Sequence, residues 1–315
     1  MHRMVSYWLS ILIAFIFVSF IWQLAETHIV TFTGKLSFKV FKKSFIEINT
    51  NDAQGIPMRY YPGVGLIYDP EYIAQEASRF YKTRVEKDRE QSFLQLSGWL
   101  EQQLDTKGLL PDNYNFPPAN RNAPWYRAST QAATMVALAQ RAGFLRNTDT
   151  LRKAENIFVL LQPGNSDLSI ESPDSTVWFT GKSEKSISGM INTLLKLNEY
   201  YELMGNPKAK ELYEAGLKRL QYFLPELEIE GYLDDPSVRV GRRLEHQQFT
   251  EKLEEINKKS PNPVLSADID RYKRLDRNLT FFQMIMQGAW ARLAGFFLAC
   301  FAVFLIVYKF LRVPR

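Results

Sequence analysis

The sequence predicts a mostly α-helical protein: an α/α barrel or half-toroid of paired helices with a short N-terminal β-hairpin, bracketed by two transmembrane helices. Two observations lead to this prediction. From residue 70 onward, apolar side chains recur at helical spacing in segments separated by Gly, Pro and Asn. Uninterrupted apolar runs also lie near both ends of the 315-residue chain.

The two apolar runs cover residues 7–24 and 288–311. Each is close to the ~20 residues that cross a bilayer as a helix, the form in which a backbone satisfies its own hydrogen bonds in lipid. The first run has no charged residue, and the second has only Arg292 and Lys309 near its edges. A cleavable signal peptide is the alternative for the first run, but segment 23–26 is a poor cleavage site. We therefore expect two helices that hold the chain in a lipid bilayer.

The charge of the chain predicts an orientation. There are 39 Lys and Arg against 34 Asp and Glu, a formal charge of +5, and the body between the apolar runs is formally neutral. Nucleic-acid binding needs a basic surface on the body, so no nucleic-acid partner is expected. Basic flanks tend to stay in the cytoplasm. Both termini are therefore predicted to be cytoplasmic, with the main domain periplasmic, extracellular or luminal; the excess basic residues are Arg3, Arg292, Lys309, Arg312 and Arg315.

Cysteine and histidine are scarce. The single cysteine, Cys300, lies in the second apolar run, so the body has neither a disulfide nor a thiol nucleophile. Two of the three histidines, His2 and His28, flank the first run. This excludes a His-rich metal site, although an all-carboxylate cation site stays open. No cofactor and no metal are expected.

These patterns divide the chain into five parts. They are an N-terminal anchor (1–25), a β-hairpin with a loop (26–65), a helical domain (66–250), a charged helical connector (251–287) and a C-terminal anchor (288–315).

The hairpin is predicted from residues 29–48, which alternate apolar and polar side chains and are rich in β-branched and aromatic types, with Gly34 as the turn. Residues 49–65 contain the Asn, Asp, Gly and Pro of a loop.

Helical periodicity follows from Pro70 onward, and the segments join in pairs through loops rich in aromatics and prolines, which is typical of α/α folds. Such folds place a groove at the loop end, often for sugar chains. Charge-dense segments 252–259 and 268–277 are expected to be solvated helix. The other predicted helices cover about 88–104, 128–142, 148–161, 187–201 and 207–224.

Three stretches of the helical domain resemble a known family. The first has the Tyr-Asp-Pro and Ile-Ala-Gln of residues 68–75, the second is PWYRASTQ at 124–131, and the third is the Ser-Gly-Met helix of 188–201. In order and spacing, over about 65–250, they are similar to the C-terminal catalytic domain of the D-glucuronyl C5-epimerase family. The family's large N-terminal β-domain has no room here beyond the hairpin.

The resemblance implies an isomerase that acts on an anionic polysaccharide of the heparan type. That family removes the C5 proton of a glucuronate within the chain and returns one to the opposite face. Because the proton is α to a carboxylate, the intermediate resembles an enolate and needs cations or hydrogen-bond donors. The reaction also needs an acid–base group on each face.

The chain departs from the family at catalytic elements. The family's Glu-Glu-Tyr-Pro element aligns with segment 176–179, where neither the acid nor the tyrosine is present. Its Tyr-Asp-Leu element has a partial counterpart at Tyr232. In its Arg-Trp-Asp-Tyr-His element, Arg242 and His246 remain and Glu245 replaces the tyrosine. The resemblance then implies Tyr232 and Glu245 as the opposed acid–base pair, with Arg242 and His246 on the uronate carboxylate.

Further residues are candidates to contact the sugar. Aromatic rings stack on sugar faces, glutamine and tyrosine reach hydroxyls, and an arginine binds a carboxylate with two parallel hydrogen bonds. Each also has a structural interpretation, such as a turn tyrosine, a packing tryptophan or an exposed loop arginine. The candidates are Tyr68, Gln75, Trp125, Tyr126, Arg127, Gln131 and Trp178.

Two alternatives stay open beside the epimerase hypothesis. A uronate polysaccharide lyase shares the first chemical step and needs only one base. A catalytically inactive epimerase-like scaffold would bind glycan or serve as a subunit among membrane protein partners. The lost Glu-Glu-Tyr element favours the scaffold, and the retained Arg242 and His246 oppose it.

Overall fold

A computed structural model of the protein describes residues 2–44, 46–117, 120–179, 186–224, 242–276 and 290–311. Helices dominate these ranges, as predicted. They are α1 (His2–Phe41), α2 (Pro70–Lys82), α3 (Lys87–Gln102), α4 (Ala128–Leu145), α5 (Thr148–Leu161), α6 (Ile187–Met204), α7 (Pro207–Phe223), α8 (Arg242–Lys259), α9 (Pro263–Asp276) and α11 (Trp290–Leu311).

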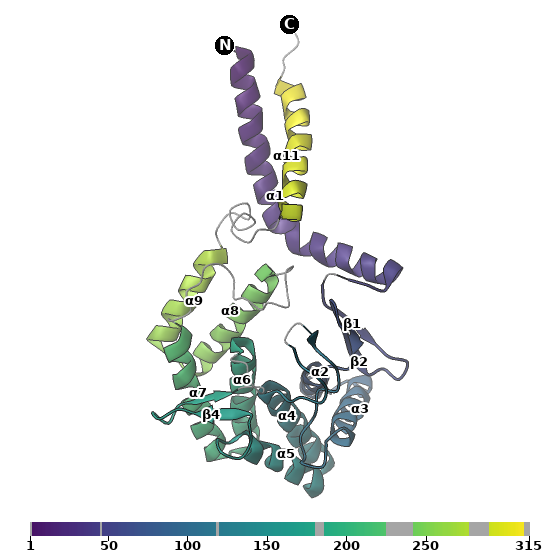
Figure 1. Ribbon diagram of the computed structural model, residues 1–315, viewed down its shortest axis with the longest axis vertical. Coiled ribbons are helices and arrows are strands. Elements are labelled where there is room, and N and C mark those ends of the chain that lie inside the picture. The colour runs from purple at the N-terminus through teal and green to yellow at the C-terminus, as the bar shows by residue number, and fades with distance from the viewer. Residues whose placement is uncertain are drawn as a thin grey trace.

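Helices α2 to α9 form an arc of helix pairs (Figure 1). Helices α2, α4, α6 and α8 contact one another in that order, and α3, α5, α7 and α9 each pack on the preceding helix. This arrangement is consistent with the predicted α/α half-toroid. Helix α4 is enclosed on nearly all sides, and its many alanines let its neighbours approach closely.

Local signals explain where the helices begin and end. The side chain of Asp69 accepts a hydrogen bond from the backbone N–H of Glu71, and Pro70 occupies the first turn of α2. Asn206 and Pro207 open α7 in the same way. Gly205 ends α6 with a left-handed φ of 64°, a conformation that costs glycine little.

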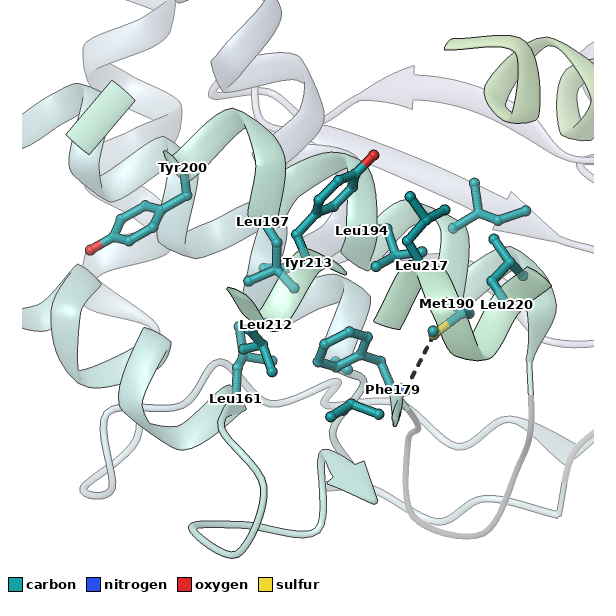
Figure 2. Close-up of a cluster of buried hydrophobic side chains, with 14 of the residues drawn as sticks. Leu161, Phe179, Met190, Leu194, Leu197, Tyr200, Leu212, Tyr213, Leu217 and Leu220 are labelled. Atoms are coloured by element: carbon teal, nitrogen blue, oxygen red, sulfur yellow. Dashed lines mark hydrogen bonds between the residues drawn. The ribbon is translucent and has the colours of Figure 1, made fainter. Parts of the chain in front are cut away.

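The main core lies between α4, α5, α6, α7 and the short strand β5 (Val177–Phe179) (Figure 2). Phe179 and Met190 meet there, with the backbone N–H of Phe179 3.4 Å from Met190 Sδ. Helix α7 approaches closely at Gly216, where an added Cβ would lie 2.8 Å from both Leu194 and Phe179.

Helices α8 and α9 are not simply solvated, contrary to the expectation for 252–259 and 268–277. Leu253, Ile256 and Tyr272 are fully buried in the main core. Between the charged residues of each helix, apolar residues recur at helical spacing. They form an apolar face that is buried against the core.

The N-terminal region differs from the predicted hairpin at 29–48. Helix α1 continues through Gly34 to Phe41, because extending an existing helix adds a hydrogen bond per residue without a new nucleation step. The strands come later, where a loop was expected, and form an antiparallel sheet: β1 (Ile48–Asn51), β2 (Pro57–Tyr61) and β3 (Gly65–Ile67). A second antiparallel pair joins β4 (Ser169–Glu171) to β5 (Val177–Phe179).

The prediction of two transmembrane helices is wrong. Across the part of the chain that the structure describes, no helix has both the length and the apolar character needed to cross a membrane. The two-pass membrane localisation and the lipid bilayer as a partner, both of which depended on those helices, are corrected with it. The apolar runs instead supply an antiparallel pair, α1 and α11, which lie side by side (Figure 1). Val18, Leu293 and Phe296 are buried between them.

Candidate functional site

A charged cluster lies where α2 and α4 begin, and Arg127 is at its centre. Arg127 Nη2 is 2.8 Å from Asp69 Oδ1 and 2.7 Å from Asp112 Oδ1, and Nε is 3.0 Å from Asp112 Oδ2. Arg127 Nη1 is 3.2 Å from Glu71 Oε2. Three carboxylates, two from the start of α2 and one from the loop before α4, thus surround one guanidinium. We call Asp69, Glu71, Asp112 and Arg127 the Arg127 cluster.

Asp69 joins the cluster to the sheet. Its Oδ2 accepts hydrogen bonds from Arg59 Nη1 and from the hydroxyl of Tyr61, each at 3.0 Å. Arg59 and Tyr61 lie on β2, and their side chains are also 3.0 Å apart. Asp69 is therefore both the cap of α2 and the contact between two arginines.

Glu71 joins the cluster to α6 and α8. Its carboxylate accepts hydrogen bonds from Ser129 Oγ and from Asn192 Nδ2, both at 2.8 Å. Asn192 Oδ1 in turn accepts one from Lys252 Nζ at 2.9 Å. The chain of contacts from Arg127 through Glu71 and Asn192 to Lys252 links α4, α2, α6 and α8.

The two buried aspartates of the cluster have opposite pKa shifts. Burial alone would raise the pKa of Asp69, but the charges of Arg127 and Arg59 outweigh it, so the pKa is lowered. Burial raises the pKa of Asp112 to about 6, and Arg127 offsets this only in part. Near neutral pH Asp112 is therefore the carboxylate of the pair that most readily takes up a proton.

Aromatic side chains of the loop between α3 and α4 lie beside the cluster. The backbone of Trp125 pairs with that of Asp112, and the Trp125 indole N–H donates to the carbonyl of Tyr114 at 2.8 Å. The Arg127 guanidinium lies 5.1 Å from the centre of the Trp125 ring. This loop thereby holds Asp112 against Arg127.

The structure brings three of the predicted sugar-contacting residues together. Arg127 and Gln75 both reach Glu71, since Gln75 Nε2 lies 3.3 Å from Glu71 Oε1. Trp125 packs beside Arg127, although only 8% of its surface is exposed.

The other four lie elsewhere, each with partners of its own. Tyr68 donates its hydroxyl to Asp52 at 2.8 Å on an exposed surface. Tyr126 donates to Asp105 at 2.7 Å, and this bond raises the pKa of Tyr126 to about 12. The remaining two are buried: Gln131 holds both the N–H and the C=O of Leu110, and Trp178 packs on Phe223.

The predicted catalytic residues fall largely beyond the described part of the chain. Tyr232 lies outside the described residues. Helix α8 begins at Arg242, but the side chains of Arg242, Glu245 and His246 also lie outside them. Lys252 follows Glu245 on the same helix by seven residues, about 10 Å along the axis.

Sequence reasoning did not single out Glu71, Asp112, Asn192 or Lys252 as site residues. Glu71 and Asn192 lie inside the stretches that resemble the epimerase family, and this is the sequence feature that could have marked them as site residues. Lys252 stood in a segment read as solvated. Among the described residues, no group of three or more His, Cys, Asp or Glu is placed to hold a metal ion.

Comparison with known proteins gives no family. No protein-family model matches the chain, and no curated protein matches it. The chain is similar to a solved GH76 α-mannanase from Bacteroides thetaiotaomicron at a TM-score of 0.46 and 10% identity, over 82% of this chain and 71% of that one. A likeness at this level carries no argument about activity, so the epimerase family stays a resemblance of motifs.

Proposed function

We propose that this protein binds an anionic, uronate-containing polysaccharide and acts on it with chemistry of the glucuronyl C5-epimerase type. One observation supports the proposal above all. The three stretches that resemble the epimerase family contribute Asp69, Arg127 and Asn192 to one connected network. Residues spaced over more than a hundred positions would not need to meet if the motifs were unrelated to a common site.

The position of the network suits an anionic ligand. It lies at the N-terminal ends of α2 and α4, where the helix dipole favours negative charge. Asn192 and Lys252 add further hydrogen-bond donors from α6 and α8. An enolate formed next to a uronate carboxylate needs such donors for its stabilisation.

The acid–base groups of the proposal come from the segment after α7. Tyr232 and Glu245 would act on opposite faces of the sugar, with Arg242 and His246 on its carboxylate. Three of these four residues belong to α8, the helix that also supplies Lys252 to the network. A uronate lyase would use the same first step and then expel the 4-linked sugar.

A second candidate is an inactive scaffold that binds glycan. Val177 and Trp178 occupy the positions aligned with an acid and the tyrosine of the family's missing element, and both are buried in the main core. The arginine and carboxylates of the Arg127 cluster are also paired with one another. Both facts favour a binding role without catalysis.

Proton exchange at C5 tests these candidates together. The full chain is incubated in D₂O with heparosan, alginate and a hyaluronan-type polymer, and each is followed by NMR. Deuterium at C5 of an intact polymer supports the epimerase, and its loss in Tyr232→Phe and Glu245→Gln assigns the bases. Cleavage with a new double bond supports the lyase. Absence of both reactions on a polymer that binds supports the scaffold.

A further inference from the structure

Lys252 is a half-buried cation in the middle of α8, on the side of that helix that faces α6. Three apolar residues of the same helix are buried in the main core: Phe249, Leu253 and Ile256. Its ammonium donates to Asn192 Oδ1 at 2.9 Å. Asn192 is itself fixed by its hydrogen bond to Glu71, so its Oδ1 holds the Lys252 side chain in a defined direction.

The other cations near this position are already neutralised. Arg127 contacts three carboxylates, and Arg59 contacts Asp69 and lies 3.7 Å from Glu47. Lys196, also on α6, is 2.7 Å from Glu199. These pairs leave little positive charge for a ligand.

Lys252 differs from them in its pairing. Within the described ranges, no carboxylate lies within salt-bridge distance of its ammonium, and its hydrogen bond there goes to the neutral amide of Asn192. An ammonium has three N–H donors, so two remain for other acceptors. The nearest negative group of the network, Glu71, acts on it only across Asn192.

The surroundings of Lys252 favour an anion beside it. Burial lowers the pKa of Lys252, and the charge of Glu71 opposes this only in part. A partly buried charge without a counter-charge is unfavourable, and a bound carboxylate would supply one. A uronate is a compact carboxylate next to hydroxyl groups, which suits an ammonium beside an amide.

We infer that Lys252, oriented by Asn192, binds the carboxylate of the ligand's uronate alongside the Arg242 and His246 of the proposed function. The inference deepens the proposed function and rests on it. It assigns the anionic recognition to the side of the network formed by α6 and α8. The ion pairs of Arg127 then hold the helices together rather than the ligand.

Competitive acetylation of the full chain tests this inference. Acetic anhydride labels the lysines with and without D-glucuronate, and mass spectrometry gives the rate at each residue. Glucuronate should slow the labelling of Lys252 at least fivefold, and glucose should leave it unchanged. Lys196, which is half-buried on α6 but paired with Glu199, is the internal control and should not respond.

Binding of a heparosan oligosaccharide by calorimetry is the second arm. Lys252→Met should weaken binding at least tenfold, Lys252→Arg should recover part of it, and Lys196→Met should stay within twofold of the wild type. Circular dichroism checks that each variant is folded. If Lys252→Met does not fold, the labelling arm still decides.

The outcomes separate the inference from the proposed function. An oligosaccharide that binds the wild type and Lys252→Met equally, without protecting Lys252, overturns the inference and leaves the proposed function standing. If glucuronate protects Lys252 from acetylation but no polymer binds, the carboxylate site is supported and the polysaccharide function is contradicted. Absence of both protection and binding overturns both.

Discussion

Arg127 and Asp112 form a bidentate ion pair, with Nε 3.0 Å from Oδ2 and Nη2 2.7 Å from Oδ1. The carboxylate of Asp112 is completely buried, whereas 21% of the Arg127 side chain is exposed. Arg127 was expected to bind a uronate carboxylate through two parallel hydrogen bonds. It makes these two bonds to the carboxylate of Asp112 instead. This ion pair fixes the loop before α4 against the start of that helix.

Asp69→Asn should destabilise the fold by about 3 kcal/mol, because it removes one partner of a buried ion network and leaves Arg59 and Arg127 with less counter-charge. Asparagine still caps α2, so the loss reports the charge. Urea unfolding measures it. Asp149→Asn is the control, since the Asp149–Arg152 pair is exposed and should contribute well under about 1 kcal/mol. Equal losses in the two variants would contradict this assignment.

Asp112 should make stability depend on pH. Its folded pKa of about 6 lies above the ordinary value of 3.8, so its contribution is present below pH 4 and is lost as pH rises through 6. The stability of the wild type relative to Asp112→Asn should therefore fall between pH 4.5 and 7.5. Urea unfolding of both proteins at the two pH values gives this double difference. A difference that is constant or rises with pH would mean that the pKa of Asp112 is not raised.

Gln131→Leu should cost about 2–4 kcal/mol, because it leaves the buried N–H and C=O of Leu110 without their partner. Gln140→Leu, on the same helix, is the control. Gln140 donates to Glu199 at 3.3 Å, and its buried Oε1 has no partner among the described residues, so its loss should cost less. Thermal unfolding compares the two. If Gln131→Leu keeps its stability and loses only glycan binding, Gln131 contacts the ligand rather than the loop.

Gly216→Ala should destabilise the core by about 1–2 kcal/mol, because the added methyl overlaps Leu194 and Phe179. The better helix propensity of alanine offsets only part of that loss. Gly143→Ala is the matched control: Gly143 also lies in a helix, and nothing lies within 4 Å of its added Cβ. That variant should gain about 0.5–1 kcal/mol in urea unfolding. A gain in both would show that α6 and α7 can move apart freely.

Helix positions could be predicted well from the sequence because their signals are local. The predicted helix at 148–161 coincides with α5, which Asn147 caps. Gly205 and Pro207 marked the end of α6 and the start of α7 as expected. Such signals depend on a few neighbouring residues, so they are readable without the fold.

The local pattern at 29–48 led to a wrong prediction, a β-hairpin. Its alternating pattern competes with an apolar segment that already forms a helix, and the helix continues through it. The outcome depends on cooperativity along the chain, which the side-chain pattern does not contain.

The charged cluster was the least predictable part of the site. Glu71 and Lys252 look like ordinary residues of charged helices, and only the packing of α2, α6 and α8 brings them to opposite ends of Asn192. Asp112 and Arg127 are close in sequence, but their pairing depends on the fold of the intervening loop.

Equilibrium binding of a heparosan oligosaccharide tests the central claim, that the α6–α8 side of the network, where Lys252 lies, binds an anionic sugar chain. The full chain is titrated by calorimetry with the oligosaccharide and with the same compound after its carboxyl groups are reduced to alcohols. We expect the uronate form to bind at least tenfold more tightly. Equal affinity for the two forms, or binding of neither, would contradict the claim.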